Sequence, residues 1–328
     1  MLTHGNPKAV RPTRVVILGA KGFLATHLSA RLEKEGIPCR CVGSAELDLT
    51  QRESANALSE VFKPDDTVVM MSVLTPDKGR DYRTYMLNEQ MAETVCRALE
   101  RQTCGHFVYM SSDAVYDGHQ TPLDEDSTRE PVDLYSLIHT SREMLLGSVL
   151  AARNIPFCFL RPTSIYGQGD THNNYGPNRF VRSAASEGKI ILFGRGEERR
   201  SHLYVDDAIT LILLSILHRS EGTLNLAAQP AVSYLDVANT VVRGFPTTVR
   251  IEFMPRTVKP VHRPYKWTQV FRFVYNLGRR IGPIVHRPYS IGAIKKAFPG
   301  YRQTPLEVGL RTLVNQTIEE QRRGREIL

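Results

Sequence analysis

The chain has 328 residues, of which 41% are hydrophobic and 23% are charged, a composition ordinary for a globular protein with a substantial core. Its 42 basic residues outnumber 34 acidic ones, which gives a formal net charge of +8 and favours an anionic, phosphorylated ligand. No zinc-finger spacing or nucleic-acid motif is present, so we do not expect a nucleic acid as partner. Five scattered cysteines without Cys-x-x-Cys argue against a disulfide framework and a metal site.

The apolar runs are too short for a membrane span or a signal peptide, so a cytoplasmic protein is expected. Residues 1–12, rich in Pro, Gly and Lys, predict a disordered lead. Short apolar runs then predict strands at 14–18, 39–42, 68–71, 107–110 and 157–161. Helical patterns separate them at 23–35, 54–61, 82–100 and 134–153. This alternation predicts an α/β fold, a doubly wound parallel sheet with helices on both faces.

The second half of the chain has a different texture. Residues 163–200, rich in Gly, Asn, Tyr and Arg, predict mostly loop. Residues 204–218 predict a helix, with two acids in its first turn where they suit the helix dipole. From residue 228 onward, short strands, helices and many prolines predict a smaller lobe, to which we also assign the basic, aromatic stretch 270–285.

A glycine turn joins the first predicted strand to the first helix. Its pattern is Gly19-x-x-Gly22-x-x-Ala25. Gly19 permits the tight turn, Gly22 lets the backbone approach a pyrophosphate at the helix N-terminus, and Ala25 permits close helix–strand packing. In this strand–turn–helix context the pattern predicts dinucleotide binding. We therefore predict a Rossmann-type dinucleotide-binding domain at 13–165, with 201–227 returning to it, and a substrate-binding lobe at 166–200 and 228–328.

The end of the second predicted strand bears on which dinucleotide binds. An acidic residue there usually binds the ribose hydroxyls of NAD. Position 43 is glycine and position 44 is serine, so no carboxylate is available to repel a 2′-phosphate. The sequence favours NADP slightly over NAD.

Two further segments carry a family resemblance. Ser111-Ser112-Asp113-Ala114-Val115-Tyr116 follows a predicted strand, and Tyr135 opens a helix. With the glycine turn, these segments resemble the extended short-chain dehydrogenases/reductases, the NAD-dependent epimerase/dehydratase family, over about residues 14–240. The resemblance implies an NAD(P)-dependent enzyme that acts on a nucleotide-diphosphate sugar. It also implies a homodimer formed through the helices at 82–100 and 134–153.

The resemblance assigns the chemical roles. Ser112 would hydrogen-bond the substrate oxygen and Tyr135 would give or take its proton. The family writes Tyr-x-x-x-Lys, whereas here the fifth residue is His139. Such a lysine, at roughly 5 Å, would stabilise a tyrosinate by about 3 kcal/mol, or about two pKa units. Histidine is mostly neutral at neutral pH, although it could still hydrogen-bond the ribose or relay a proton.

Tyr135 without that cation is expected to stay protonated, which suits reduction better than oxidation. We therefore predict a keto-sugar reductase. Two alternatives stay open: a nucleotide-sugar epimerase, and an inactive dinucleotide-binding sensor or scaffold. Asp113 is a further catalytic candidate, since this position and the Val115–Gly118 run resemble the 4-ketoreductases similar to dTDP-4-dehydrorhamnose reductase. Ala114 breaks the Asp-Glu pair of the family's 4,6-dehydratases.

The resemblance also distributes the binding residues. Asp48 could equally be a helix cap, and the arginines around position 200 could be a solvated loop. Arg200 is favoured as the diphosphate contact because a guanidinium suits phosphate. The substrate residues are Asn178, Phe180 and Arg200. The cofactor residues are Gly19, Lys21, Gly22, Phe23, Leu24, Ser44, Asp48, Ser72, Asn88, His139 and Arg161.

Overall fold

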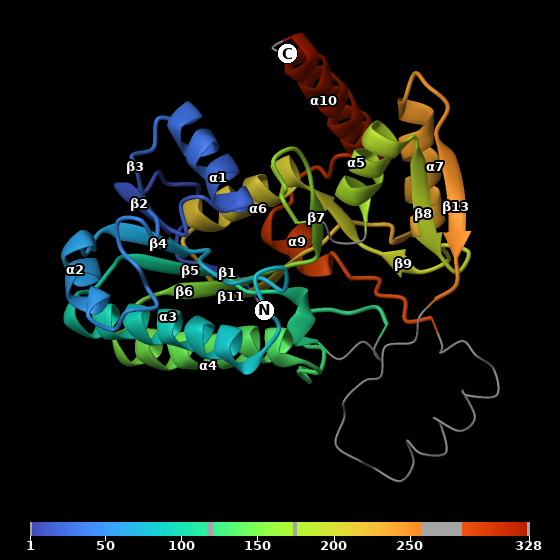
Figure 1. Cartoon of the computed structure of the whole chain (residues 1–328). Helices are drawn as coiled ribbons and strands as arrows, with labels where there is room; N and C mark the ends of the chain where they lie inside the picture. The colour runs from blue at the N-terminus through green and yellow to red at the C-terminus, as the bar shows by residue number, and fades with distance from the viewer. Residues whose placement is uncertain (1, 117–120, 173–175, 257–283, 327–328) are drawn as a thin grey trace.

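The computed structural model describes residues 2–116, 121–172, 176–256 and 284–326 (Figure 1). A seven-stranded sheet runs through its larger part in the order β1-β11-β6-β5-β4-β2-β3. All neighbouring strands are parallel except β1, which is antiparallel to β11. The strands are β1 (Thr3–His4), β2 (Arg14–Leu18), β3 (Cys39–Val42), β4 (Asp66–Met70), β5 (His106–Met110), β6 (Phe157–Pro162) and β11 (Ser220–Leu226). The predicted doubly wound α/β fold is confirmed.

Helices cover both faces of this sheet (Figure 1). On one face lie α2 (Ser54–Val61), α3 (Tyr82–Arg101) and α4 (Leu134–Ala152), with α3 and α4 side by side. On the other face lie α1 (Phe23–Lys34) and α6 (Val205–Leu217). Alternate residues of the central strands pack into two apolar cores, one on each face of the sheet. In β2, Val15 and Ile17 belong to one core, and Val16 and Leu18 belong to the other. Strands buried on both faces explain the continuous apolar runs in the sequence.

The N-terminal segment belongs to the sheet. Thr3 pairs with Glu221 and His4 with Ser220, while the Leu2 side chain is buried. Further along, the amide of Val10 donates to the carbonyl of Leu217. The prediction of a disordered lead is therefore wrong for residues 2–12. Composition alone missed it because the pairing partner, the otherwise open edge of β11, lies far away in sequence.

Residues 163–200 contain more regular structure than the predicted loop. They form β7 (Ser164–Tyr166), α5 (Pro177–Glu187), β8 (Lys189–Phe193) and β9 (Arg199–Arg200). The strands pair with distant partners: β7 with β10 (His202–Tyr204), β8 with β13 (Arg250–Met254) and β9 with β12 (Val232–Ser233). Helix α5 starts with a proline and ends at the left-handed Gly188, as helix-terminal residues often do. The loop prediction is wrong because short strands stabilised by remote pairing leave a weak local signal.

The C-terminal part completes the smaller lobe. Its helices are α7 (Tyr234–Gly244), α9 (Gly292–Ala297) and α10 (Leu306–Glu326), and α10 packs on α5 and α7. The Asp207 carboxylate on α6 accepts hydrogen bonds from the amide and hydroxyl of Thr304, which ties this part to the sheet domain. Most of the basic stretch 270–285 lies outside the described residues, and the exact division into two domains stays a prediction. Among the described residues, no helix is long and apolar enough to cross a membrane.

Candidate active site

The glycine turn lies where the chain order of the sheet reverses. Strand β2 sits between β3 and β4, so the ends of β2 and β4 form the switch point at which α/β sheets bind ligands. Gly19 has φ of +105°, and a Cβ there would lie 2.9 Å from the Ser72 amide nitrogen. Any side chain at position 19 would therefore strain the turn and press against the end of β4.

The start of α1 offers free amide groups to an anion. Gly22 is its N-cap, no side chain caps it, and its first turn holds no acid. Lys21 and Gly22 are exposed, whereas Phe23 and Leu24 are partly buried, and Ala25 is packed in the core. Exposed, uncapped amides beside a side-chain-free turn fit the pyrophosphate of a dinucleotide.

The neighbouring end of β3 would face the adenosine. Ser44 is exposed there. The Asp48 carboxylate accepts hydrogen bonds from the amide and hydroxyl of Thr50, and these lower its pKa. Asp48 thus serves the local turn, in line with the alternative capping role. Arg40 and Glu46 form an exposed ion pair on the same edge.

Ser112 and Tyr135 come together at the end of β5. Ser112 caps the short 3-10 turn η1 (Asp113–Val115), and its Oγ accepts from the Ala114 amide at 3.1 Å. Tyr135 stands in the first turn of α4, which Asp133 and Ser136 fix through a capping box. Burial raises the pKa of Tyr135 to about 12, although a hydrogen bond from Ser112 opposes the rise. Tyr135 is therefore protonated at neutral pH.

His139 is turned toward the sheet rather than toward solvent. Its Nδ1 lies 2.8 Å from the Tyr109 hydroxyl, and its ring meets that of Tyr135 edge-on at 4.8 Å. Burial, and then the charge of Arg142, lower the pKa of His139 to about 3. Burial also raises the pKa of Tyr109, so this hydrogen bond joins two uncharged groups. The other ring nitrogen, Nε2, is buried and finds no partner in the described residues.

Asp113 is held by the C-terminal part of the chain. The Tyr289 hydroxyl donates to its Oδ2 at 2.8 Å, and Arg287 donates to its backbone carbonyl at 2.7 Å. The segment around Tyr289 also pairs with Leu123, beyond η1. No sequence motif indicates these contacts, because they join positions far apart in the chain. Residues 117 and 118 of the ketoreductase-like run lie outside the described residues.

Arg161 holds the residues next to Ser112 and Asp113 in place. It donates twice to the Glu143 carboxylate, at 2.8 and 2.6 Å, and once to the Tyr116 hydroxyl at 2.7 Å. Glu143 also accepts from Ser111, beside Ser112. The Arg161 side chain is buried, so its contribution to the cofactor site, which stays a prediction, would be to fix the strand ends.

Asn88 and Ser72 shape the wall after β4. The Asn88 amide accepts from the Leu74 amide and donates to the Leu74 carbonyl, and the residue is fully buried. Arg142, also fully buried, donates to the carbonyls of Asn88 and Ser72. The Ser72 Oγ is buried and has no partner within the described chain. It is thus a polar atom available to a bound cofactor, whereas Asn88 acts by holding the loop.

The predicted substrate residues lie apart from one another. The Asn178 side chain accepts a hydrogen bond from the Gly167 amide and donates one to the Gly167 carbonyl. Phe180 is buried in the core against Tyr234. Arg200 is partly exposed and pairs with Glu198. Only Arg200 presents a side chain that a ligand could reach, so Asn178 and Phe180 would act through the backbone they position.

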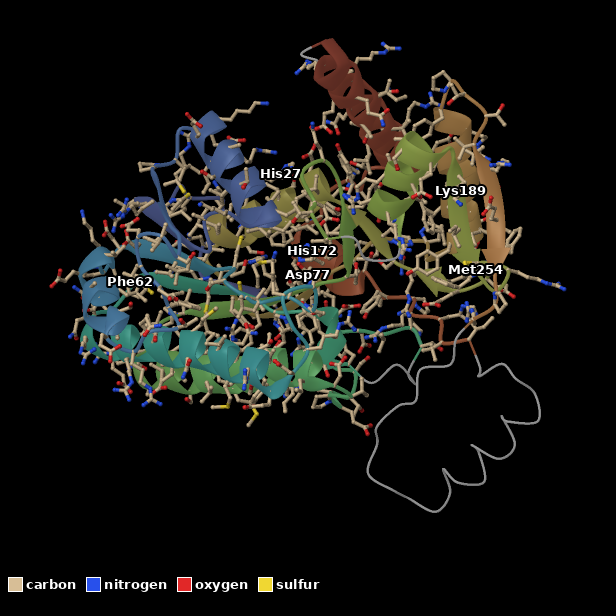
Figure 2. All side chains as sticks on the ribbon, in the orientation of Figure 1. His27, Phe62, Asp77, His172, Lys189 and Met254 are labelled. Atoms are coloured by element: carbon tan, nitrogen blue, oxygen red, sulfur yellow. The ribbon has the colours of Figure 1, made fainter. Side chains whose placement is uncertain are left out.

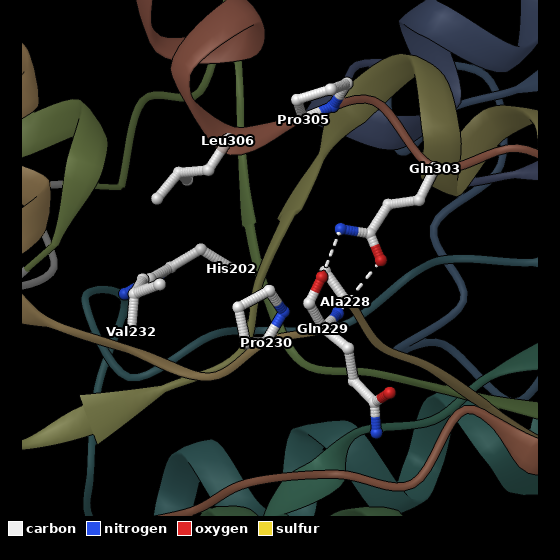
Figure 3. A pocket seen from close by; sticks show the side chains of 8 residues that line it. All are labelled: His202, Ala228, Gln229, Pro230, Val232, Gln303, Pro305 and Leu306. Carbon is white, nitrogen blue, oxygen red and sulfur yellow. Dashed lines mark hydrogen bonds between the residues drawn. The ribbon is translucent and has the colours of Figure 1, made fainter.

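A cavity of about 380 Å³ opens between β10, the end of β11 and the start of α10 (Figure 3). His202 lies on its wall with both ring nitrogens buried and unpartnered in the described chain, and burial lowers its pKa to about 3. The pair Gln229 and Gln303 closes another side through two hydrogen bonds. A second cavity, of about 550 Å³, has Tyr289 and Lys295 in its lining.

A histidine links two loops at the sheet edge. His172 Nε2 lies 2.8 Å from the Thr75 hydroxyl and 3.2 Å from Asp77, and its Nδ1 lies 3.1 Å from Asp170 (Figure 2). The hydrogen bond to Asp170 raises the pKa of His172. The loop after β4 is thereby tied to the loop after β7.

The sheet, the glycine turn and the Ser112–Tyr135 pair define a dinucleotide-binding enzyme of the Rossmann type. Residues 15–227 match the NAD dependent epimerase/dehydratase family, and the chain belongs to that family. Its cofactor class is accordingly a nicotinamide dinucleotide, and the residues at the glycine turn fit one. Among the described residues, no group of three or more side chains could hold a metal ion.

Individual relatives are distant. The chain is 22% identical to UDP-N-acetyl-alpha-D-glucosaminuronate decarboxylase of Bacillus cytotoxicus, over 74% of this chain and 83% of the relative. It is 20% identical to N-acetyl-alpha-D-glucosaminyl-diphospho-ditrans,octacis-undecaprenol 4-epimerase of Escherichia coli O157:H7, over 86% and 83%. The fold is similar to that of a GDP-L-fucose synthetase from Naegleria fowleri bound to NADP, with a TM-score of 0.75, 17% identity and 97% of each chain covered.

Proposed function

We propose that the protein is an NAD(P)H-dependent reductase of a keto group on a nucleotide-diphosphate sugar. The observation that carries the proposal is the surroundings of Tyr135 at the start of α4, where its ring meets the buried His139 ring at 4.8 Å. The pKa of Tyr135 is raised to about 12, and its neighbour His139 is neutral, with a pKa lowered to about 3. A protonated tyrosine is ready to donate a proton to a carbonyl oxygen, whereas an alcohol oxidation needs it ionised first.

Ser112 and Tyr135 have separate roles in the proposed reaction. The Ser112 hydroxyl hydrogen-bonds the carbonyl oxygen of the sugar, and Tyr135 donates its phenolic proton to the same oxygen. A reduced nicotinamide, when bound, supplies the hydride to the carbonyl carbon. The product is an alcohol, and Tyr135 is left as a phenolate that solvent reprotonates. The catalytic part of Asp113 is to orient the sugar from η1.

NADPH is proposed as the preferred reductant. Positions 43 and 44 carry no acid, and Arg40 on the same edge is exposed and paired with the exposed Glu46. An arginine can exchange such a partner for a 2′-phosphate at little cost. Dissociation constants for NADPH and NADH, measured by fluorescence, test this preference. Arg40→Ala should weaken NADPH binding and leave NADH binding unchanged.

The deciding experiment is NADPH and NADH oxidation by the purified protein. The substrates are a panel of keto-sugar nucleotides with uridine, guanosine and thymidine diphosphates. Steady turnover that Tyr135→Phe abolishes supports the reductase. Cofactor binding without turnover on any of them would instead favour a dinucleotide sensor or scaffold.

An epimerase is the second candidate, supported by family membership and by the epimerase relative. An epimerase needs no added reductant, because the hydride removed from the sugar returns to it. Incubation with unmodified UDP-sugars and NAD, followed by chromatographic separation of the epimers, distinguishes it from a reductase. Conversion there, without net change in cofactor absorbance, would replace the reductase proposal.

A homodimer through α3 and α4 is also proposed. These neighbouring helices expose large apolar side chains, which is typical of an interaction surface. The exposed residues are Tyr82, Met86 and Leu87 on α3, and Met144 and Leu145 on α4. Light scattering of the native chain and of Met144→Glu tests the interface: the native chain should be dimeric and the variant should dissociate.

A further inference from the structure

We propose that His172 is a positioning residue that bridges two loops beside the cofactor site and controls how fast the dinucleotide enters and leaves. The two loops are the loop after β4 (residues 71–81) and the loop after β7 (residues 167–172). The inference depends on dinucleotide binding alone. It therefore goes beyond the reductase proposal and would hold for an epimerase as well.

Both loops lie against the segment that fits the pyrophosphate. A Cβ at Gly19 would lie 2.9 Å from the amide nitrogen of Ser72, near the beginning of the loop after β4. A Cβ at Gly167, which begins the loop after β7, would lie 3.7 Å from Cζ of Phe23, the first residue of α1. A dinucleotide bound at the start of α1 is therefore next to both loops.

His172 joins the two loops through both of its ring nitrogens. Its Nε2 lies 2.8 Å from the Thr75 hydroxyl and 3.2 Å from the Asp77 carboxylate, and its Nδ1 lies 3.1 Å from the Asp170 carboxylate (Figure 2). Thr75 in turn donates its hydroxyl proton to Asp77 at 2.6 Å. We call this set of contacts the His172 bridge.

The geometry of the bridge requires a doubly protonated imidazole. An ionised carboxylate can only accept, and the Thr75 oxygen also accepts, because its proton is engaged with Asp77. A neutral imidazole has a single N–H and would turn a lone pair toward one of these acceptors. In agreement, the hydrogen bond to Asp170 and the charges of Asp170 and Asp77 raise the pKa of His172. The complete bridge is therefore the charged one.

The groups around His172 favour this charge on balance. Arg182 donates to the carbonyls of Asp170 and His172, at 2.7 and 2.6 Å, and so fixes the loop after β7 on α5. Lys78 opposes the imidazolium charge, and the raised pKa shows that the two carboxylates outweigh it. The charged groups facing the bridge in the described chain are Asp77 and Lys78 on the loop after β4, Asp170 on the loop after β7 and Arg182 on α5; further along the same loop, Gln168 contacts His27 on α1 and Glu320 on α10.

The bridge opposes entry and exit of the cofactor alike, because it consists of the chain's own groups. Movement of such loops often limits ligand exchange in enzymes. The side chains of His172 and Asp77 are 30% and 36% exposed. Breaking so exposed a contact should change rates about fivefold rather than by orders of magnitude.

Stopped-flow fluorescence of NADPH measures both rates without turnover. His172→Gln keeps a hydrogen-bonding side chain and removes the charge. At about pH 6 this variant should bind and release NADPH about fivefold faster than the native chain, with a dissociation constant within about twofold of native. His218→Gln is the matched control, since His218 is also partly buried but bonds to the carbonyl of Asn6. The control should behave like the native chain.

The native rates should also depend on pH. The charged bridge is fully present below the ordinary histidine pKa near 6.5 and is lost as the pH rises through the raised pKa of His172. Association and dissociation of NADPH by the native chain should therefore accelerate about fivefold between about pH 6 and about pH 9. His172→Gln, measured over the same range, should lack this acceleration.

Unchanged rates in His172→Gln at about pH 6 overturn the inference. A changed dissociation constant with an unchanged association rate also overturns it, because His172 would then contact the cofactor directly. Should His172→Gln not fold, Asp77→Asn provides the second route. It should accelerate both rates in the same way, and unchanged rates in that variant are equally decisive. Since no sugar is needed, shifted rates without any keto-sugar turnover would refute the reductase and leave the role of His172 in place.

Discussion

Position 139 holds an imidazole that is buried, neutral and hydrogen-bonded to Tyr109. Because His139 is neutral, it does not lower the pKa of Tyr135 as a charged residue at this position would. The charge of Arg142, one helical turn further along α4, also lowers the pKa of this imidazole.

His139→Lys should therefore shift the pH dependence of alcohol oxidation. A cation at roughly 5 Å lowers the pKa of Tyr135 by about two units. The pH above which alcohol oxidation accelerates should move down by that amount, as initial rates of NADP reduction across pH would reveal. His139→Gln, which keeps a neutral acceptor for Tyr109, is the control and should leave the profile in place. An unchanged profile in the lysine variant would contradict this account of position 139.

Gly19 makes a second residue-scale prediction. Gly19→Ala forces a side chain into a left-handed conformation and to 2.9 Å from the Ser72 amide nitrogen, so cofactor affinity should fall at least about tenfold, with stability lower by about 1–2 kcal/mol. Fluorescence titration with NADPH measures the first effect and urea unfolding the second.

Gly36→Ala separates the two causes in that experiment. Gly36 also has a positive φ, +67°, but nothing lies within 4 Å of its Cβ position. This variant should lose stability similarly and keep its cofactor affinity. Equal affinity losses in both variants would show that the close approach at Gly19 is not what matters.

At the scale of elements, the segment that carries Tyr289 packs against η1, the turn that holds Asp113. It bonds to Asp113 on η1, to Leu123 beyond it, and to Arg199 on β9. The catalytic turn is thereby fixed by the smaller lobe and by its own strand. The position of this turn therefore depends on both lobes, and so would the binding of a substrate that contacts both.

Tyr289→Phe tests this connection. Removing its hydroxyl frees the Asp113 carboxylate, which should cost about 1 kcal/mol of stability and raise KM for the sugar nucleotide more than it lowers kcat. Tyr301→Phe is a matched control, because the Tyr301 hydroxyl is buried without a partner in the described chain. The control should be neutral or slightly stabilising. If Tyr289→Phe behaves like the control, the contact with Asp113 has no role in substrate binding.

The helices and strands differ in how well they could be predicted from the sequence. Buried parallel strands and amphipathic helices leave local patterns, so β2, α2 and the start of α4 were predicted at their observed positions. The pairing of β1 with β11, or of β8 with β13, depends on distant partners and has no local signature. In the site, Gly19, Ser112 and Tyr135 follow from motifs. Tyr289, which holds Asp113 from far along the chain, follows from no motif.

Across the whole molecule, buried histidines predict acid sensitivity. Burial lowers the pKa of His106 to about 4, and those of His139 and His202 to about 3. The unfolded chain takes up these protons below about pH 6.5 while the folded chain does not, so stability falls as pH drops from about 6.5 toward 4. Each histidine contributes up to about 1.4 kcal/mol per pH unit in that window. His172, with its raised pKa, gains stability only as the pH falls toward about 6.5 and contributes a constant amount below that pH.

Urea unfolding at about pH 7.5 and about pH 5.5 measures the effect. His202→Phe keeps a ring beside Tyr234 and removes two buried, unpartnered nitrogens. The variant should therefore be at least as stable as the native chain near neutrality and lose less stability in acid. A native chain equally stable at both pH values would contradict the assignment of these histidines as buried and neutral.

The pairing of β1 with β11 also orders events during synthesis. Thr3 and Glu221 are neighbours in the sheet, so β1 must wait, while the chain is synthesised, for β11, which is the last strand of this sheet in chain order. When β11 is present without β1, its outer edge has no cover, and such an edge can pair with another chain. Deletion of residues 1–9 should leave that edge permanently open and convert a folding hazard into a lasting tendency to aggregate.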